Sequence, residues 1–144
     1  MRFWDSSALL PLIAIQARSD DVKSLLDDDD DMVVWWGTRV ELASGLCRLI
    51  REGAIDETNL KAAEQLADDA GEIEPTMEIR LAAIRILRVH HLQAADSLQL
   101  AAALVWTDHN PSGAGFVCLD KRLREAAEKE GFEVLPVAST KSNL

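Results

Sequence analysis

The chain has 144 residues, of which 48% are hydrophobic, and its 25 acidic and 15 basic residues give a formal net charge of −10. This composition is typical of one globular domain that buries its own core, and it argues against a disordered chain. The acidic excess argues against a protein that coats nucleic acid with a basic face. It leaves open an enzyme that acts on phosphodiesters, because bound divalent cations would reverse the local charge at its site.

The two cysteines, Cys47 and Cys118, lie far apart, and neither belongs to a CxxC pair or to a zinc-like spacing. This pattern favours a reducing compartment without a disulfide framework. The N-terminus shows no basic leader before an apolar run, and no apolar stretch approaches the roughly 20 residues of a membrane span. We therefore expect a cytoplasmic protein with no signal peptide and no contact with a membrane.

The first half of the chain predicts two strands, at 2–4 and 32–36, and four helices, at 8–15, 20–26, 38–53 and 57–70. Ser6 or Ser7 suits the N-cap of the first helix, which would have Pro11 in its first turn. The acidic run 27–31 favours a solvated loop over a metal site.

The second half predicts helices at 77–89, 93–106 and 121–131 and strands at 116–120 and 132–136, while 71–75 fits either a loop or a short strand. Adjacent side chains of a strand point to opposite faces, so Trp35 and Trp36 predict a sheet that is covered on both sides. Strands that alternate with helices indicate an α/β fold with a mainly parallel sheet.

Four carboxylates, Asp5, Glu41, Asp96 and Asp120, lie at or near predicted helix starts. Each has a structural alternative to a functional role. Asp5 and Asp120 end apolar strands directly before helices, where an aspartate can act as the N-cap. Glu41 fits a capping box with Thr38. Asp96 lies in an almost uniformly apolar helix, where a carboxylate is costly unless it caps the helix, has a partner or binds a metal.

The shared position of the four carboxylates favours one site over four unrelated caps. In an open parallel sheet, ligands bind outside the carboxyl ends of the strands, where helix N-termini also gather. Carboxylates in one pocket raise each other's pKa unless a cation neutralises them. Oxygen ligands alone suit Mg²⁺ or Mn²⁺ rather than zinc. Such a site can bind a phosphate and generate a hydroxide nucleophile, which is the chemistry of metal-dependent nucleases.

Four stretches, "DSSALL", "TRVELASGL", "AADSLQLAAAL" and "FVCLDKRL" with "GFEVLP", resemble in order and spacing the blocks of PIN-domain ribonucleases. Within this family the chain is most similar to VapC-type toxins of bacterial toxin–antitoxin pairs. The resemblance implies a single PIN domain over residues 1–144, built as a three-layer sandwich with a mainly parallel sheet flanked by helices. It further implies a Mg²⁺- or Mn²⁺-dependent endoribonuclease that hydrolyses RNA phosphodiester bonds, a cognate VapB-type antitoxin and a homodimer.

The resemblance places the family's acidic quartet on Asp5, Glu41, Asp96 and Asp120. Asp5, Asp96 and Asp120 would hold the metal directly or through water, and Glu41 would complete the pocket and help to orient the attacking water. Cys118 departs from the threonine or serine that is common in the family at this position. A thiol is a poorer hydrogen-bond partner than a hydroxyl.

The substrate-binding residues are less well defined by the sequence. Ser6 and Thr38 could contribute hydroxyls near the pocket, although both are equally good caps. Basic side chains on three helices could contact an RNA backbone, although most of them fit solvated helix faces: Arg48, Arg51, Arg80, Arg85, Arg88, Lys121, Arg122 and Arg124. The histidines, His90, His91 and His109, show no pairing with a nucleophile and are expected to be structural.

Two other functions are compatible with an acidic pocket. A phosphoacceptor signalling domain would carry an adjacent acidic pair after its first strand and a lysine after a late strand. Here Asp5 is followed by two serines, and Pro136 follows the last strand. A non-catalytic PIN-like binding module is the other alternative, and retention of all four acids argues against it.

Overall fold

The computed structural model describes residues 1–138, so the last six residues of the predicted domain lie outside the described part. The helices are α1 (Ser6–Ile13), α2 (Ser19–Asp28), α3 (Thr38–Arg51), α4 (Glu57–Asp69), α5 (Met77–Val89), α6 (Ala94–Trp106) and α7 (Lys121–Glu130). The strands are β1 (Arg2–Trp4), β2 (Met32–Trp35), β3 (Gly71–Ile73), β4 (Gly115–Val117) and β5 (Glu133–Leu135).

The five strands form one sheet in the order β3-β2-β1-β4-β5, and every neighbouring pair is parallel. The predicted α/β class with a parallel sheet is therefore confirmed. The stretch 71–75, which the sequence left open between loop and strand, supplies β3 at one edge of the sheet. Chain order reverses between β1 and β4, so the connections that leave these two neighbouring strands diverge and open a crevice at their carboxyl ends.

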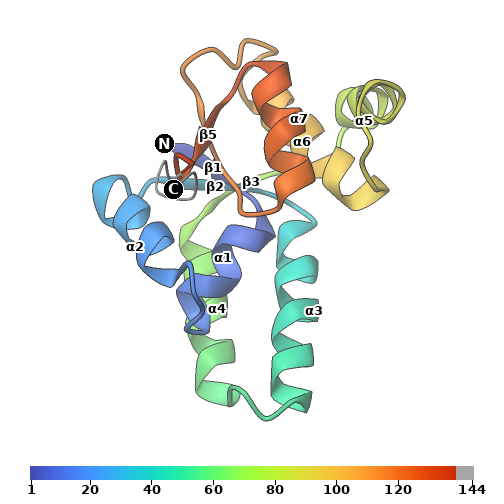
Figure 1. Ribbon diagram of the computed structural model, residues 1–144. Helices are drawn as coiled ribbons and strands as arrows, with labels where there is room; N and C mark the ends of the chain where they lie inside the picture. The colour runs from blue at the N-terminus through green and yellow to red at the C-terminus, as the bar shows by residue number, and fades with distance from the viewer. Residues whose placement is uncertain (139–144) are drawn as a thin grey trace.

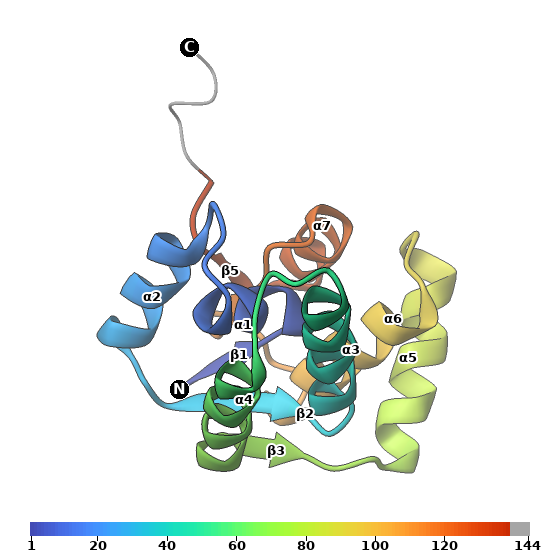
Figure 2. The same ribbon diagram turned by 90° about the horizontal axis from the view of Figure 1, so that it is seen from below.

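Helices cover both faces of the sheet, as expected for a three-layer sandwich (Figure 1). Phe3 and Trp4 are adjacent in β1, both are fully buried, and they point into different cores. Phe3 packs with residues of α5, α6 and α7, whereas Trp4 packs with residues of α1, α2, α3 and α4. Figure 1 shows the α3–α4 pair projecting from its side of the sheet, and in Figure 2, seen from below, the two helices point toward the viewer. The alternation of side chains along one strand thus fills two separate cores.

The start of α1 differs from the prediction. Neither Ser6 nor Ser7 is the N-cap, because both lie inside the helix and the Asp5 carboxylate accepts a hydrogen bond from the Ser7 backbone N–H. Pro11 is the sixth residue of α1 and not part of its first turn. The helix ends two residues after this proline.

The junction of β2 and α3 also differs from the prediction. Trp35 is buried in the core with α5 and α6, but Trp36 lies outside the strand and is 52% exposed. The sheet is covered on both sides, as predicted, but the adjacent residues of β2 that point into the two different cores are Val33 and Val34. The N-cap of α3 is Gly37, and no side chain caps this helix end, so the predicted capping box between Thr38 and Glu41 does not form.

The acidic run is divided between two elements. Its first two residues, Asp27 and Asp28, end α2, and the other three lead into β2. Asp28 pairs with Arg2, and Asp29 accepts a hydrogen bond from the N-terminal ammonium group. The predicted loop is therefore limited to the last three residues of the run, and two of its carboxylates pair with groups at the start of the chain.

The predicted strand 116–120 is shorter than expected, because β4 ends at Val117 and residues 118–120 connect it to α7. The helix predicted at 77–89 is confirmed with the same bounds in α5. No helix in residues 1–138 is long and apolar enough to cross a membrane.

Candidate active site

The crevice at the carboxyl ends of β1 and β4 contains the first of the predicted site residues. Asp5 directly follows β1, and its backbone N–H donates to the carbonyl of Val117 at the end of β4, at 2.9 Å. This bond extends the pairing of the two strands and fixes the Asp5 backbone beside the β4–α7 connection. The Asp5 residue is 2% exposed.

All four predicted carboxylates line one cavity of about 170 Å³. Asp5 comes from the end of β1, Glu41 from the first turn of α3, Asp96 from the first turn of α6, and Asp120 from the N-cap of α7. The structure therefore brings together every side chain that the sequence singled out for the site. Ser6 also lines the cavity, whereas Thr38, the other candidate hydroxyl, does not.

The Asp5 carboxylate is held on one side by neighbouring hydroxyl, thiol and amide groups. Its Oδ2 accepts hydrogen bonds from the Ser7 N–H at 3.1 Å, from the Ser7 hydroxyl and from the Cys118 thiol at 3.6 Å. The Ser7 Oγ in turn accepts from the Leu119 N–H at 2.9 Å. Ser7 thus joins the start of α1 to the β4–α7 connection, and the sequence reasoning considered it only as a cap.

The structure shows which groups the Cys118 thiol contacts in place of the hydroxyl that is common in the family. Its side chain is fully buried, and its thiol contacts the Asp5 carboxylate and the backbone carbonyl of Asp120 rather than the Asp120 side chain. Burial, followed by the negative charge of Asp5, raises the pKa of this thiol far above its usual value. Cys118 is therefore a neutral donor to Asp5.

Glu41 is held by Gln99, a residue of α6 that the sequence reasoning did not assign to the site. The Gln99 side-chain amide donates to Glu41 Oε2 at 2.8 Å and to Thr38 Oγ1 at 2.9 Å. Gln99 is completely buried, and Thr38 is 1% exposed. A glutamine three residues after Asp96 in an apolar helix is the signal that could have identified it, because a buried amide requires partners.

Asp96 and Asp120 differ in how the fold holds them. Asp96 is the third residue of α6 and does not cap this helix, whose N-cap is Gln93. Asp120 is the N-cap of α7, and its Oδ1 accepts from the Leu123 N–H at 3.0 Å. The capping alternative is therefore correct for Asp5 and Asp120, and both residues also line the shared cavity. One carboxylate oxygen can cap a helix while the other faces the cavity.

Burial raises the pKa values of three of the carboxyl groups, and repulsion between carboxylates adds to this effect for Glu41 and Asp96. Burial is the largest cause in each case. For Asp5, this effect exceeds the opposing effect of its hydrogen bonds. The pKa of Glu41 is raised to about 7, with smaller contributions from the charges of Asp5 and Asp96. The pKa of Asp96 is raised to about 6, with contributions from the charges of Asp120 and Asp5. The apo pocket is therefore electrostatically unfavourable at neutral pH.

Two buried polar atoms without a partner belong to Asp5 and to Gln99, the residue that holds Glu41. In residues 1–138, three buried side-chain nitrogen or oxygen atoms lack a hydrogen-bond partner: Trp4 Nε1, Asp5 Oδ1 and Gln99 Oε1. Two of the three belong to the side chains described above. A buried carboxylate oxygen without a partner costs free energy unless a cation or water satisfies it.

The donor set fits a divalent cation, although the side chains as they stand do not enclose one. No group of three or more His, Cys, Asp or Glu side chains in residues 1–138 is close enough together to hold a metal ion. The unpaired Asp5 Oδ1 and the raised pKa values are nevertheless what a cation would relieve. The pocket offers carboxylate oxygens without His or Cys ligands, since Cys118 remains a protonated donor, and this set suits Mg²⁺ or Mn²⁺.

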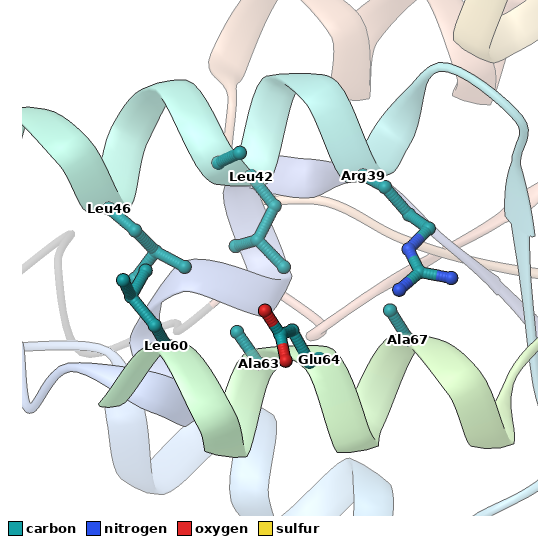
Figure 3. A pocket seen from close by; sticks show the side chains of 8 residues that line it. Arg39, Leu42, Leu46, Leu60, Ala63, Glu64 and Ala67 are labelled. Atoms are coloured by element: carbon teal, nitrogen blue, oxygen red, sulfur yellow. The ribbon is translucent and has the colours of Figure 1, made fainter. Parts of the chain in front are cut away.

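A second cavity, of about 110 Å³, lies between α3 and α4 and has a different character. Figure 3 shows Leu42 and Leu46 of α3 facing Leu60 and Ala63 of α4 across it. Arg39 lines its edge and pairs with Asp68 at 3.0 Å. The lining contains only one carboxylate, Glu64, so it offers no comparable cation site.

Comparison with known proteins identifies the class. The family model described as "PIN domain" matches residues 2–129, and the chain therefore belongs to the PIN domain family. PIN domains are in general nucleases. The family predicted from the four sequence stretches is confirmed. A search of curated proteins gave no match.

Two solved structures share the fold. One is PAE2754 from Pyrobaculum aerophilum, with a TM-score of 0.64 and 17% sequence identity over 91% of this chain and 81% of that one. The other is a toxin–antitoxin complex from Klebsiella pneumoniae, with a TM-score of 0.63 and 14% identity over 85% of this chain and 89% of that one. At these identities the similarity establishes the fold alone.

Proposed function

We propose that this PIN domain is a Mg²⁺- or Mn²⁺-dependent endoribonuclease that acts as the toxin of a type II toxin–antitoxin pair, and that residues 1–144 form one domain. The observation that carries the catalytic part is the convergence of Asp5, Glu41, Asp96 and Asp120 on one cavity. Four acids from four separate elements have no shared structural purpose, since only two of them cap helices.

In the proposed site, Asp5, Asp96 and Asp120 would hold the metal directly or through water. The bound ion would supply a Lewis acid for a phosphate oxygen and lower the pKa of a water molecule. Glu41 would orient the attacking water and accept its proton at a carboxylate oxygen. Gln99 donates to this carboxylate and fixes its position, while Ser7 and Cys118 fix Asp5.

The partner part of the proposal rests on the shared fold. One structural neighbour is a toxin–antitoxin complex, and the chain shares its fold. We infer a cognate VapB-type antitoxin as partner, a homodimer as the assembly and the cytoplasm as the location. A phosphoacceptor domain is less well supported, because no lysine is among the described residues that line the cavity. A binding module without catalysis leaves the four convergent acids unexplained.

The direct test is incubation of the purified protein with a mixture of structured and single-stranded RNAs in Mg²⁺ or Mn²⁺, with and without EDTA. We expect internal cleavage that EDTA abolishes. Asp96→Asn, which keeps the side-chain shape but removes the charge, should abolish it as well. Absence of cleavage by the wild-type protein with either metal, or undiminished cleavage by Asp96→Asn, would contradict the proposal. Labelling of Asp5 by a phosphoryl donor would favour the signalling alternative.

A further inference from the structure

A basic cavity separate from the acidic one has no role in the site described above. It measures about 370 Å³, roughly twice the volume of the acidic cavity, and is lined by the α5–α6 connection and by one face of α7. Arg122 and Lys129 contribute cationic side chains, and His90 and His91 contribute imidazoles. This lining contrasts with the net charge of −10 of the whole chain.

The cationic groups of this cavity are available to a ligand. Arg122, Lys129 and His91 are exposed, and within residues 1–138 neither Arg122 nor Lys129 takes part in an ion pair. The nearby carboxylate of Glu130 is already bound by Arg85 at 2.8 Å and by His90 at 2.7 Å.

The lining also contains one opposing charge. Glu125 lies on the same face of α7 as the two cations, three residues after Arg122 and four residues before Lys129. It is exposed and forms no ion pair within residues 1–138. The lining of the cavity is therefore net positive. Removal of the Glu125 carboxylate would increase this positive charge.

The two segments that line the basic cavity also supply the acidic one. α7 begins at the N-cap Asp120, two residues before Arg122, and the α5–α6 connection leads from His91 to Asp96 within five residues. From Asp120 to Lys129 the helix advances about 13 Å, at ~1.5 Å per residue. This length matches about two to four nucleotides of a single strand, at ~3.4 Å or more per nucleotide.

From this arrangement we infer that the cavity between α7 and the α5–α6 connection binds the phosphate backbone of the RNA strand a few nucleotides from the bond held at the acidic cavity. This site rests on the proposed ribonuclease function and specifies where its substrate is held. Arg122 and Lys129 contact phosphates without reading sequence. The acidic pocket repels RNA until it binds a cation, so a separate cationic contact explains how a protein of this charge holds its substrate.

Binding is tested under conditions that prevent cleavage. A fluorescein-labelled, single-stranded, random-sequence RNA of 15 nucleotides is titrated with protein in Ca²⁺, with gel electrophoresis confirming that the RNA stays intact. The test variant is Arg122→Gln with Lys129→Gln. The control is Lys23→Gln with Lys61→Gln, which likewise removes two positive charges, from exposed positions on α2 and α4. Neither lysine lines the acidic or the basic cavity.

We expect the test variant to bind severalfold more weakly than the control. Its plot of log affinity against log salt should be less steep by about 1.4, because each phosphate contact on a single strand contributes a slope of ~0.7. Arg122→Lys, which keeps the charge, should recover most of the binding. Glu125→Gln should bind more tightly than wild type, since it removes a like charge from the same cavity. These four variants alter exposed side chains, and matching thermal unfolding curves would confirm that they fold.

The outcome separates this site from the proposed function. If wild type cleaves RNA in Mg²⁺ but the test variant matches the control in affinity and salt dependence, the binding site is wrong and the ribonuclease proposal stands. The site is also overturned if Glu125→Gln weakens binding. If wild type neither cleaves nor binds RNA, the proposed function fails and this site fails with it.

Discussion

Two cavities bordered by the same helix differ in how much they destabilise the folded state. The acidic cavity of about 170 Å³ and the apolar cavity of about 110 Å³ share Leu42 of α3 as a lining residue. The acidic cavity has an unpaired buried oxygen on Asp5 and three carboxyl groups with raised pKa values. The apolar cavity has no unpaired buried polar atom among its described lining residues.

This difference separates a site from a packing gap. Natural proteins tolerate local violations of the rules of stability mainly at functional positions. A hollow between two helices violates no such rule beyond the loss of packing contacts. We therefore expect substitutions in the acidic cavity to reduce activity without reducing stability, and substitutions in the apolar cavity to do the reverse.

The largest effect is expected for Asp5→Asn. Asparagine is as good an N-cap as aspartate, so the start of α1 should remain intact. Loss of an outer-shell partner of a metal site typically costs ~10–100-fold in activity, so loss of a direct ligand should cost more than about 100-fold. Because the substitution removes a buried charge, the melting temperature in EDTA should be equal to or higher than that of wild type. Cleavage kinetics test the expected loss of activity, and thermal unfolding tests the expected melting temperature. A fully active variant would show that Asp5 is not part of the active site.

The opposite behaviour is expected for Leu46→Ala, which enlarges the apolar cavity. Leu46 is 1% exposed, and truncation of a buried leucine costs about 2–5 kcal/mol. Urea unfolding should show this loss of stability. Cleavage in Mg²⁺, measured at a temperature where the variant is folded, should stay near the wild-type rate. A large loss of activity in the folded variant would mean that the two cavities are coupled through α3.

Gln99→Leu changes a residue that could affect both activity and stability, since Gln99 is buried but contacts Glu41. Loss of its amide should reduce kcat by about 10–100-fold, the usual range for a residue that orients a catalytic group. The hydrogen bond from Gln99 lowers the pKa of Glu41, so its removal should shift the acidic limb of the pH–rate profile to higher pH. The matched control is Thr38→Val, which removes the other partner of the amide and should leave the profile in place. A purely structural Gln99 would lower stability without moving that limb.

The sequence predicted the fold well where a pattern was local and repeated. Helix α5 has an apolar periodicity and a Thr76 side chain that accepts a hydrogen bond at its start, and its predicted bounds are confirmed. The four carboxylates were predicted to meet because the carboxyl ends of parallel strands share one edge of the sheet. The cavity brings them together, while their catalytic roles remain predictions.

The errors arose where a distant contact overrode a local pattern. Thr38 and Glu41 have the spacing of a capping box, but Gln99 binds both side chains from a position about sixty residues later in the chain. No local pattern contains this contact. Ser7 was assigned to the helix cap, yet its hydroxyl serves Asp5 and the backbone of Leu119. In both cases a side chain that was assigned to a helix end belongs to the network that supports the site.

The raised pKa of Glu41 predicts a pH-dependent difference between wild type and Glu41→Gln in EDTA. The carboxyl group has a pKa of about 7 in the folded state against an ordinary value of 4.5, so its protonated form favours folding. This contribution is fully present below pH 4.5 and is lost as the pH rises through 7. The two proteins should therefore melt at similar temperatures near pH 4.5, and the variant should be the more stable by a few degrees at pH 8. A constant difference across this range would show that Glu41 is not desolvated.

The smallest effect is expected for Arg39→Met, which tests whether the two sides of α3 are independent. Arg39 lies two residues before Glu41 but lines the apolar cavity, and its ion pair with Asp68 is exposed, at 44% and 61% of the two side chains. Methionine keeps an apolar stem, so only the charge is lost, and an exposed pair contributes at most about 1 kcal/mol. Urea unfolding should show this small change, and cleavage in Mg²⁺ should be unaffected. Reduced cleavage by the folded variant would place the positive charge of Arg39 in the field of the acidic cavity, and residues of the α3–α4 side would then belong to the functional surface.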